Sequence, residues 1–182
     1  AIANEKCRLL HDSQPPWYFL KLFRYLEEFG AAVIGSAYSF TLTGALEISS
    51  EGHWVHRPTP MEEGIPLDDR DSALLALAKW NLERVRQQGF VLTQEKSSNL
   101  LGIVKDWHVD GVIIHLNRGC EGTAYGQMEA RLSLIDAKVP VMTYEGNMAD
   151  RREFNESQTL DRVDSFMETL GLKKQPSAAG AK

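Results

Sequence analysis

The chain has 182 residues and carries 20 Lys and Arg against 25 Asp and Glu, which gives a formal charge of −5. Apolar residues make up 43 % and charged residues 25 %, as in typical globular proteins, and no apolar run approaches the roughly 18 residues that a membrane-spanning helix requires. The mild acidity argues against non-specific nucleic-acid binding, which depends on basic patches that displace counterions.

The N-terminal part of the chain predicts a strand, a helix and a second strand. Residues 7–10 form a short apolar run that ends ahead of a Pro-Pro pair. Residues 17–29 carry apolar side chains at steps of three and four, which predicts a helix, and Gly30 stands where a left-handed C-terminal cap belongs. Residues 31–35 form a continuous apolar run, typical of a parallel strand that is covered on both faces.

The middle of the chain fits this alternation less well. Residues 37–70 are rich in Gly, Pro, Ser and Thr, and we expect an irregular excursion from the sheet there. A helix is then expected from an N-cap at Asp71 or Ser72 to Gly89. Its apolar face is formed by Leu75, Ala78, Leu82 and Val85.

The C-terminal half returns to regular alternation. We expect a helix over residues 97–108, a strand over 111–116, a strand over 139–144 and a last helix over 157–171. A further helix is expected between the two strands. Its apolar face is formed by Tyr125, Met128, Leu132 and Ile135.

Strands that alternate with helices of this length indicate βαβ units, a parallel sheet and helices on both of its faces. We therefore predict an α/β fold with a small, doubly wound, flavodoxin-like sheet of four parallel strands. Residues 1–172 are expected to form one α/β domain, and residues 173–182 a disordered tail of small residues. Because the chain lacks an initiator Met, we expect it to be a domain of a longer protein.

The chain contains two cysteines, Cys7 and Cys120. They are too few for a disulfide scaffold and indicate a reducing compartment, which we take to be the cytoplasm. Cys7 lies at the start of a predicted strand and is expected to be structural. Cys120 follows a strand and precedes a helix, close to Arg118, and both a helix N-terminus and a cation lower the pKa of a thiol. Cys120 is thus a candidate nucleophile or metal ligand, with a structural thiol as the alternative.

Ligands of open α/β sheets bind beyond the carboxyl ends of the strands. Three loops qualify by this criterion, at residues 11–17, 117–123 and 145–152, and we expect them to lie along one edge. The third loop contains Glu145 and Asp150, whose ordinary interpretation is a solvated charge cluster near a helix start. No residue of these loops can be assigned a role in proton transfer.

Several common motifs are missing from the second loop. A low-molecular-weight phosphatase loop requires an Arg six positions after its cysteine, where this chain has Gly126. A Walker phosphate-binding loop requires Gly-Lys-Ser/Thr, and no G-x-G-x-x-G follows a strand. His53 and His56 form an H-x-x-H pair within the irregular segment, and we interpret them as surface residues rather than metal ligands.

Two segments are nonetheless distinctive. Residues 111–123, which include Arg118-Gly119-Cys120-Glu121-Gly122-Thr123, and residues 139–154 resemble the benzoyl-CoA reductase / 2-hydroxyglutaryl-CoA dehydratase family. The segment from Arg8 to Trp17 is similar to the start of the C-terminal domain of that family. The 118–123 loop looks most similar to a cluster-bearing subunit of the benzoyl-CoA reductase branch.

This resemblance implies a [4Fe–4S] cluster next to an acyl-CoA substrate, with cysteine ligands from two domains. Cys120 matches the C-terminal cysteine ligand, and the remaining ligands would lie in a preceding domain. Arg118, Glu121, Glu145 and Asp150 become candidates for the lining of the substrate cleft. The resemblance also implies two partners: a homologous sister subunit, and an ATP-hydrolysing activator that carries its own cluster and delivers low-potential electrons.

Three functions remain open from the sequence. The leading one is the C-terminal domain of a subunit of an ATP-dependent benzoyl-CoA reductase, which reduces the aromatic ring by single electrons. The second is the same domain in a 2-hydroxyacyl-CoA dehydratase, which removes water through a ketyl radical. The third belongs to another class: a non-catalytic α/β interaction module in which Cys120 is structural.

Overall fold

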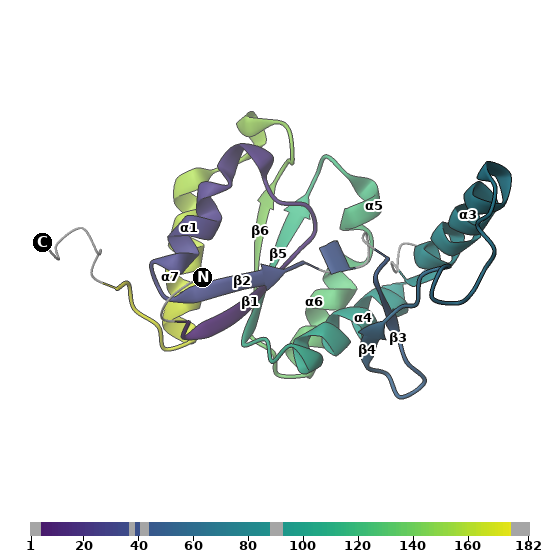
Figure 1. Cartoon of the computed structure of the whole chain (residues 1–182). Helices are drawn as coiled ribbons and strands as arrows, with labels where there is room; N and C mark the ends of the chain where they lie inside the picture. The colour runs from purple at the N-terminus through teal and green to yellow at the C-terminus, as the bar shows by residue number, and fades with distance from the viewer. Residues whose placement is uncertain (1–4, 37–38, 41–43, 88–92, 176–182) are drawn as a thin grey trace, which may run out of the picture.

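The four predicted strands pair into one parallel sheet. The computed structural model describes residues 5–36, 39–40, 44–87 and 93–175. Its sheet has the order β2-β1-β5-β6, with all neighbours parallel (Figure 1). The strands are β1 (Cys7–Asp12), β2 (Ala31–Gly35), β5 (Gly111–Asn117) and β6 (Val141–Gly146).

Helices cover both faces of this sheet, as the alternation predicts. Buried side chains of α1 and α7 pack on one face, and those of α4 and α6 pack on the other. Figure 1 shows the two pairs on opposite sides of the strands. These helices are α1 (Lys21–Glu27), α4 (Thr93–Asp106), α6 (Gln127–Asp136) and α7 (Glu156–Thr169).

The strand order reverses between β1 and β5. The chain moves from β1 to β2 on one side and then returns to place β5 on the other side of β1. Such a switch point separates the loops that follow the two strands and opens a ligand crevice at their carboxyl ends. The doubly wound, flavodoxin-like α/β prediction is confirmed, and it locates the site at this edge.

The strand boundaries shift toward the carboxyl edge compared with the prediction. β6 begins at Val141 because Pro140 has no N–H to donate to a ladder. β1 continues through His11 and Asp12, both of which are buried although they are polar. The apolar runs thus marked the centres of the strands, while the polar residues that follow them complete the sheet.

The segment expected to be irregular contains a short hairpin. Strands β3 (Leu46–Ile48) and β4 (Trp54–His56) pair antiparallel. The buried Trp54 anchors the hairpin on α4, since its indole N–H donates to the carbonyl oxygen of Asn99 at 3.1 Å. The expectation of irregular structure over 37–70 is therefore wrong for these six residues, and residues 37–38 and 41–43 lie outside the described part.

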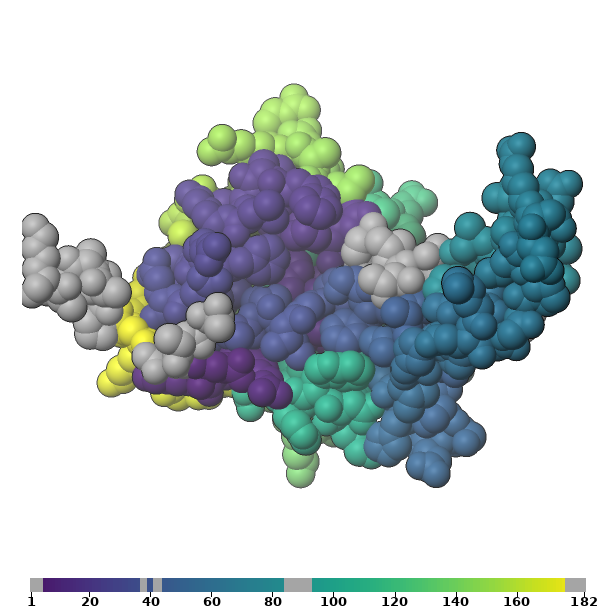
Figure 2. Space-filling model, in the orientation of Figure 1, coloured from purple at the N-terminus to yellow at the C-terminus, as the bar shows by residue number. Residues whose placement is uncertain are grey.

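The helix α3 (Arg70–Gln87) forms where expected, but its apolar face does not pack on the sheet. Leu75 and Leu82 are 56 % and 70 % exposed. The opposite face makes the contacts: Ala76 is buried, and the Trp80 indole donates to the carbonyl oxygen of Pro58 at 3.0 Å. Figure 2 shows α3 standing out from the body of the molecule. The side chain of Val85 and the expected end at Gly89 lie outside the described residues.

The helix predicted around Tyr125 is broken into α5 (Glu121–Ala124) and α6. The break lies at Gly126, which has a left-handed φ of 70° and whose Cβ position would come within 3.0 Å of Thr93. Because the chain turns at Gly126 before α6 begins, α6 is rotated about its axis compared with the expected continuous helix. The face that was expected to pack on the sheet therefore points toward solvent. Its members Tyr125, Met128, Leu132 and Ile135 are all exposed.

The buried face of α6 has a polar residue at its start. The Gln127 side chain donates to the backbone oxygen of His115 at 2.8 Å, and Ala130 and Leu134 follow it into the core. A hydropathy pattern cannot identify such a face, because its first member is polar. None of the helices among the described residues is long and apolar enough to cross a membrane.

The helix expected over residues 17–29 and the tail expected from residue 173 both differ slightly from the prediction. The expected helix 17–29 divides into a 3₁₀ turn (Trp17–Phe19) and α1, and Gly30 has the predicted left-handed φ of 78°. The beginning of the expected disordered tail contacts this unit: the Lys174 ammonium donates to the Tyr25 hydroxyl at 2.6 Å. Residues 176–182 lie outside the described part, and their disorder stays a prediction.

Two neighbouring leucines on α6 test the orientation of that helix. Leu134→Ala should lower the free energy of unfolding by about 2–5 kcal/mol, since it leaves a cavity in the core. Leu132→Ala should change it by less than about 0.5 kcal/mol, because this side chain is exposed. Urea unfolding of the two variants measures both values, and the reverse order would contradict the structure.

Candidate functional site

The three loops expected to converge do meet at the carboxyl edge. The buried side chain of Asn117, at the end of β5, connects them: its oxygen accepts the N–H groups of Gly119 at 3.0 Å and Met148 at 3.1 Å. Its amide nitrogen lies 3.4 Å from the side-chain oxygen of Gln14 in the first loop. One carboxamide therefore fixes the positions of the loops after β1, β5 and β6 relative to one another.

The loop that bears the candidate cysteine passes very close to the third loop. A Cβ atom on Gly119 would lie 2.5 Å from the side-chain oxygen of Asn147. That oxygen accepts the backbone N–H groups of Ala149 and Asp150, so it has little freedom to move away. Glycine is required here by the close approach of the two loops.

Cys120 caps the first turn of α5 and is partly exposed. The hydroxyl and backbone N–H of Thr123 and the backbone N–H of Gly122 are near the Cys120 thiol and lower its pKa, because these groups stabilise the thiolate. The Thr123 hydroxyl also lies 3.3 Å from the Cys120 carbonyl oxygen, which ties the cysteine to the turn. The turn therefore favours the thiolate, which is the form that binds metals.

A largely buried lysine, which the sequence analysis did not single out, holds this turn through hydrogen bonds. The Lys96 ammonium, at the start of α4, donates to the backbone oxygens of Thr123 at 2.7 Å and Tyr125 at 3.0 Å. It also lies 3.9 Å from a carboxylate oxygen of the buried Asp12, at the end of β1. Burial raises the pKa of Asp12 and lowers that of Lys96, and each charge opposes the effect on the other.

Two buried histidines and a tyrosine fill the space beneath the loops. His11 Nε2 lies 2.8 Å from the Tyr144 hydroxyl, and the His115 ring stacks on Tyr144 with 4.7 Å between centroids. His115 Nδ1 lies 2.6 Å from the carbonyl oxygen of Gln14. Because a carbonyl only accepts, Nδ1 of His115 carries the proton and Nε2 is unprotonated.

Both histidines are neutral at physiological pH. Burial, with a smaller contribution from the neighbouring His115, lowers the pKa of His11 to about 3. Burial also lowers the pKa of His115. Since burial raises the pKa of Tyr144 as well, all three rings stay uncharged.

The candidate cleft residues have separate environments. The exposed Arg118 and Glu145 form an ion pair between the ends of β5 and β6, and Glu121 is exposed in the first turn of α5. Asp150 caps the 3₁₀ turn Arg151–Glu153, and its pKa falls to about 2 because the Arg152 side chain and backbone bind its carboxylate. Arg118 and Glu145 thus flank the Cys120 loop, whereas Asp150 already has a local partner.

The structure separates the other candidate ligands. Cys7 lies at the opposite end of β1 from the carboxyl edge, is buried, and has a pKa raised to about 12, chiefly by burial. His53 pairs with Asp106 and His56 with Glu62, as expected for surface residues. Within the described residues, no group of three or more His, Cys, Asp or Glu side chains could hold a metal ion.

Comparison with known proteins gives a family match over most of the chain. Residues 1–170 match the profile of a family described as 2-hydroxyglutaryl-CoA dehydratase, D-component. The chain is also 34 % identical over 70 residues to the alpha subunit of (R)-2-hydroxyglutaryl-CoA dehydratase from Acidaminococcus fermentans. That alignment covers 38 % of this chain and 15 % of the relative.

Two further relatives are alpha subunits of related enzymes. The chain is 32 % identical over 78 residues to that of (R)-phenyllactyl-CoA dehydratase from Clostridium sporogenes, covering 41 % of this chain and 19 % of the relative. It is 33 % identical over 79 residues to that of lactoyl-CoA dehydratase from Anaerotignum propionicum, covering 42 % and 18 %. The aligned part is thus less than a fifth of each curated relative.

The lowered pKa of His11 predicts a loss of stability in mild acid. Between about pH 6.5 and 3 the unfolded chain binds a proton at this histidine and the folded chain does not, so the free energy of unfolding falls as pH falls. From pH 7.5 to 5 this histidine lowers the free energy of unfolding by about 2 kcal/mol. Urea unfolding at pH 7.5 and 5.0 should show a smaller loss in His11→Gln than in the parent. The exposed His56→Gln should behave as the parent does; equal losses in all three would contradict the assignment.

The environment of Cys120 predicts selective thiol chemistry. Iodoacetamide at pH 7 should label Cys120 and leave the buried Cys7 unmodified. Thr123→Val should slow the labelling, because the pKa of the Cys120 thiol rises when the hydroxyl is lost. Thr169→Val, on the exposed surface of α7, is the matched control and should leave the rate unchanged. An unchanged rate in Thr123→Val would show that the hydroxyl does not act on the thiol.

Proposed function

The chain belongs to the 2-hydroxyglutaryl-CoA dehydratase D-component family, and we propose that it is one domain of a subunit of a 2-hydroxyacyl-CoA dehydratase. The family match over residues 1–170 and the three dehydratase alpha subunits support this assignment. The benzoyl-CoA reductase branch, which the sequence analysis placed first, has weaker support, because none of these three relatives is a reductase.

Cys120 is the residue that would hold the [4Fe–4S] cluster of the proposed enzyme. Its partly exposed thiol has a lowered pKa and lies at the ligand-binding edge of the sheet, so it fits the role of one thiolate ligand. When bound, such a cluster supplies one-electron transfer at low potential. The N–H and hydroxyl groups of Thr123 and Gly122 would then orient the sulfur and lower its basicity.

The other ligands would come from outside this chain. A cluster is usually held by about four cysteines, and the described part of the chain offers a single accessible one, since Cys7 is buried at the far end of β1. We propose that a preceding domain of the same subunit completes the site. The exposed apolar stripes of α3 and α6 support coverage by other parts of a complex, which would include a sister subunit and an ATP-hydrolysing activator in the cytoplasm.

The residues around Cys120 would position the substrate thioester. Arg118 and Glu145 are exposed beside the loop and can contact a polar part of an acyl-CoA. Glu121 lies in the same turn as the cysteine. Lys96, which lies 3.9 Å from the Asp12 carboxylate, would hold this turn in place. The neutral His11, Tyr144 and His115 would add no charge beneath the loops.

The second candidate function is reduction of benzoyl-CoA by the same type of complex. One observation favours it: the loop Arg118-Gly119-Cys120-Glu121-Gly122-Thr123 resembles that of a cluster-bearing reductase subunit. Purified complex, supplied with ATP and a low-potential reductant, should dehydrate 2-hydroxyacyl-CoA thioesters. Reduction of the benzoyl-CoA ring without any dehydration would favour the second candidate.

The ligand assignment predicts an effect on metal content. In the full-length subunit with its partners, Cys120→Ser should remove at least about half of the iron bound by this subunit, because a cluster that loses one of its few thiolate ligands is unstable. Cys7→Ala is the matched control and should keep its iron. Iron and sulfide analysis together with the visible absorption of the cluster measures this. Unchanged iron in Cys120→Ser would exclude Cys120 as a ligand and favour the non-catalytic interaction module.

A further inference from the structure

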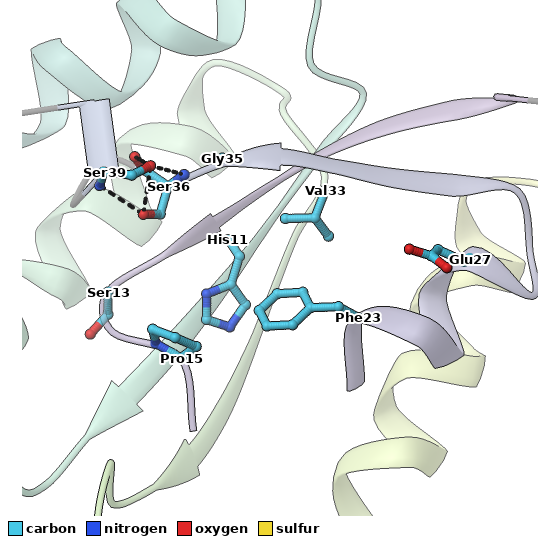
Figure 3. Close-up of a pocket in the computed structure, with 9 residues that line it drawn as sticks. All are labelled: His11, Ser13, Pro15, Phe23, Glu27, Val33, Gly35, Ser36 and Ser39. Carbon is cyan, nitrogen blue, oxygen red and sulfur yellow. Dashed lines mark hydrogen bonds between the residues drawn. The ribbon is translucent and has the colours of Figure 1, made fainter. Parts of the chain in front are cut away.

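A cavity of about 290 Å³ lies next to His11, between the carboxyl ends of β1 and β2 and the helix α1 (Figure 3). It opens on the same edge of the sheet as the Cys120 loop, on the other side of β1. Its volume is near the lower limit of natural ligand sites, so it suits a small group rather than a whole cofactor. The lining residues are His11, Ser13, Pro15, Phe23, Glu27, Val33, Gly35, Ser36 and Ser39.

The interior of this cavity is apolar and aromatic. The His11 and Phe23 rings meet edge to face with 5.3 Å between centroids, and Val33 lies across from them (Figure 3). His11 is neutral, and its Nε2 is already engaged by the Tyr144 hydroxyl. These surfaces favour a hydrocarbon group, since burial of such a group releases it from water.

The charged and polar groups at the cavity do not suit an anion. The described residues that line the cavity include no Lys or Arg, and the one charged residue among them, Glu27, is an acid that pairs with Arg24 at 2.8 Å. The hydroxyls of Ser36 and Ser39 bond to each other and to the Ser36 backbone. A carboxylate placed here would lose its hydration without gaining a cation, which is costly.

The third serine that lines the cavity, Ser13, adds no charge to it. Ser13 Oγ is buried and has no hydrogen-bond partner among the described residues. Ser13 also has a positive φ of 73°, which places its side chain at the turn between β1 and the first loop. Because the Ser13 hydroxyl is neutral, it does not supply the cation that a bound carboxylate would need.

The three relatives act, by their names, on thioesters whose side chains differ. 2-Hydroxyglutaryl carries a carboxylate, phenyllactyl a phenyl ring and lactoyl only a methyl group. We infer that this cavity receives the side chain of the 2-hydroxyacyl group, an inference that rests on the proposed function. The cavity selects uncharged side chains, aliphatic or aromatic, over side chains that carry a carboxylate. The CoA part remains outside, because the cavity is too small for it.

The test is a binding titration of the intact enzyme complex with phenyllactyl-CoA, lactoyl-CoA and 2-hydroxyglutaryl-CoA. The complex should bind phenyllactyl-CoA at least about tenfold more tightly than 2-hydroxyglutaryl-CoA. Val33→Phe fills the cavity and should weaken phenyllactyl-CoA binding at least about tenfold while changing lactoyl-CoA binding less than about threefold. Val55→Phe, on the exposed hairpin, is the matched control and should change neither.

If the Val33→Phe variant folds poorly, reversal of the charge at Glu27 gives an independent test. Glu27→Lys lies at the partly exposed mouth and should strengthen 2-hydroxyglutaryl-CoA binding at least about tenfold, with phenyllactyl-CoA little changed. Equal losses for all thioesters in Val33→Phe, together with no gain in Glu27→Lys, would overturn the assignment of the cavity and leave the proposed function intact. If the folded complex binds none of the three thioesters, the proposed function fails, and the inference fails with it.

Discussion

The carboxyl edge of the sheet depends on the buried side chain of Asn117. Its one carboxamide accepts the N–H groups of Gly119 and Met148 and approaches Gln14, so it joins three loops that are far apart in the chain. The position of Cys120 follows from this, because the cysteine is the residue after Gly119. Asn117 also explains why a polar residue is buried at the end of an apolar strand: its oxygen satisfies two backbone donors that would otherwise lack partners.

Below that junction, the structure keeps buried polar groups neutral or paired. His11, His115 and Tyr144 all have pKa shifts that favour their uncharged forms, and burial is the main cause in each case. The Lys96 and Asp12 charges lie 3.9 Å apart, and the Lys96 ammonium also donates hydrogen bonds to the backbone oxygens of Thr123 and Tyr125 at the end of α5. The three rings therefore add no charge beneath the loops.

The sheet could be predicted from the sequence, whereas two helix faces could not. Continuous apolar runs such as Gly111–Asn117 have few alternatives to a buried parallel strand, and the topology then brings the loops together. Helical periodicity identifies the more apolar face but not what that face contacts. On α6 the buried face begins with the polar Gln127, which is buried because its side chain donates a hydrogen bond to the backbone oxygen of His115. On α3 the buried face includes Ala76, whose small side chain contributes little to a hydropathy pattern. Lys96 and Asp12 could not be found either, since their pairing joins residues 84 positions apart.

The exposed stripe of α6 bears on how the proposed site would be completed. The exposed stripe of α6 begins at Tyr125, directly after the four-residue helix that Cys120 caps. A partner that covers this stripe therefore also approaches the thiol, and burial of the stripe would supply the binding energy that holds the remaining cluster ligands in place. In this arrangement the apolar pattern of α6 belongs to the interface rather than to the core of this chain. The left-handed conformation of Gly126 precedes α6 and sets the rotation of that helix about its axis, so that the apolar stripe points outward.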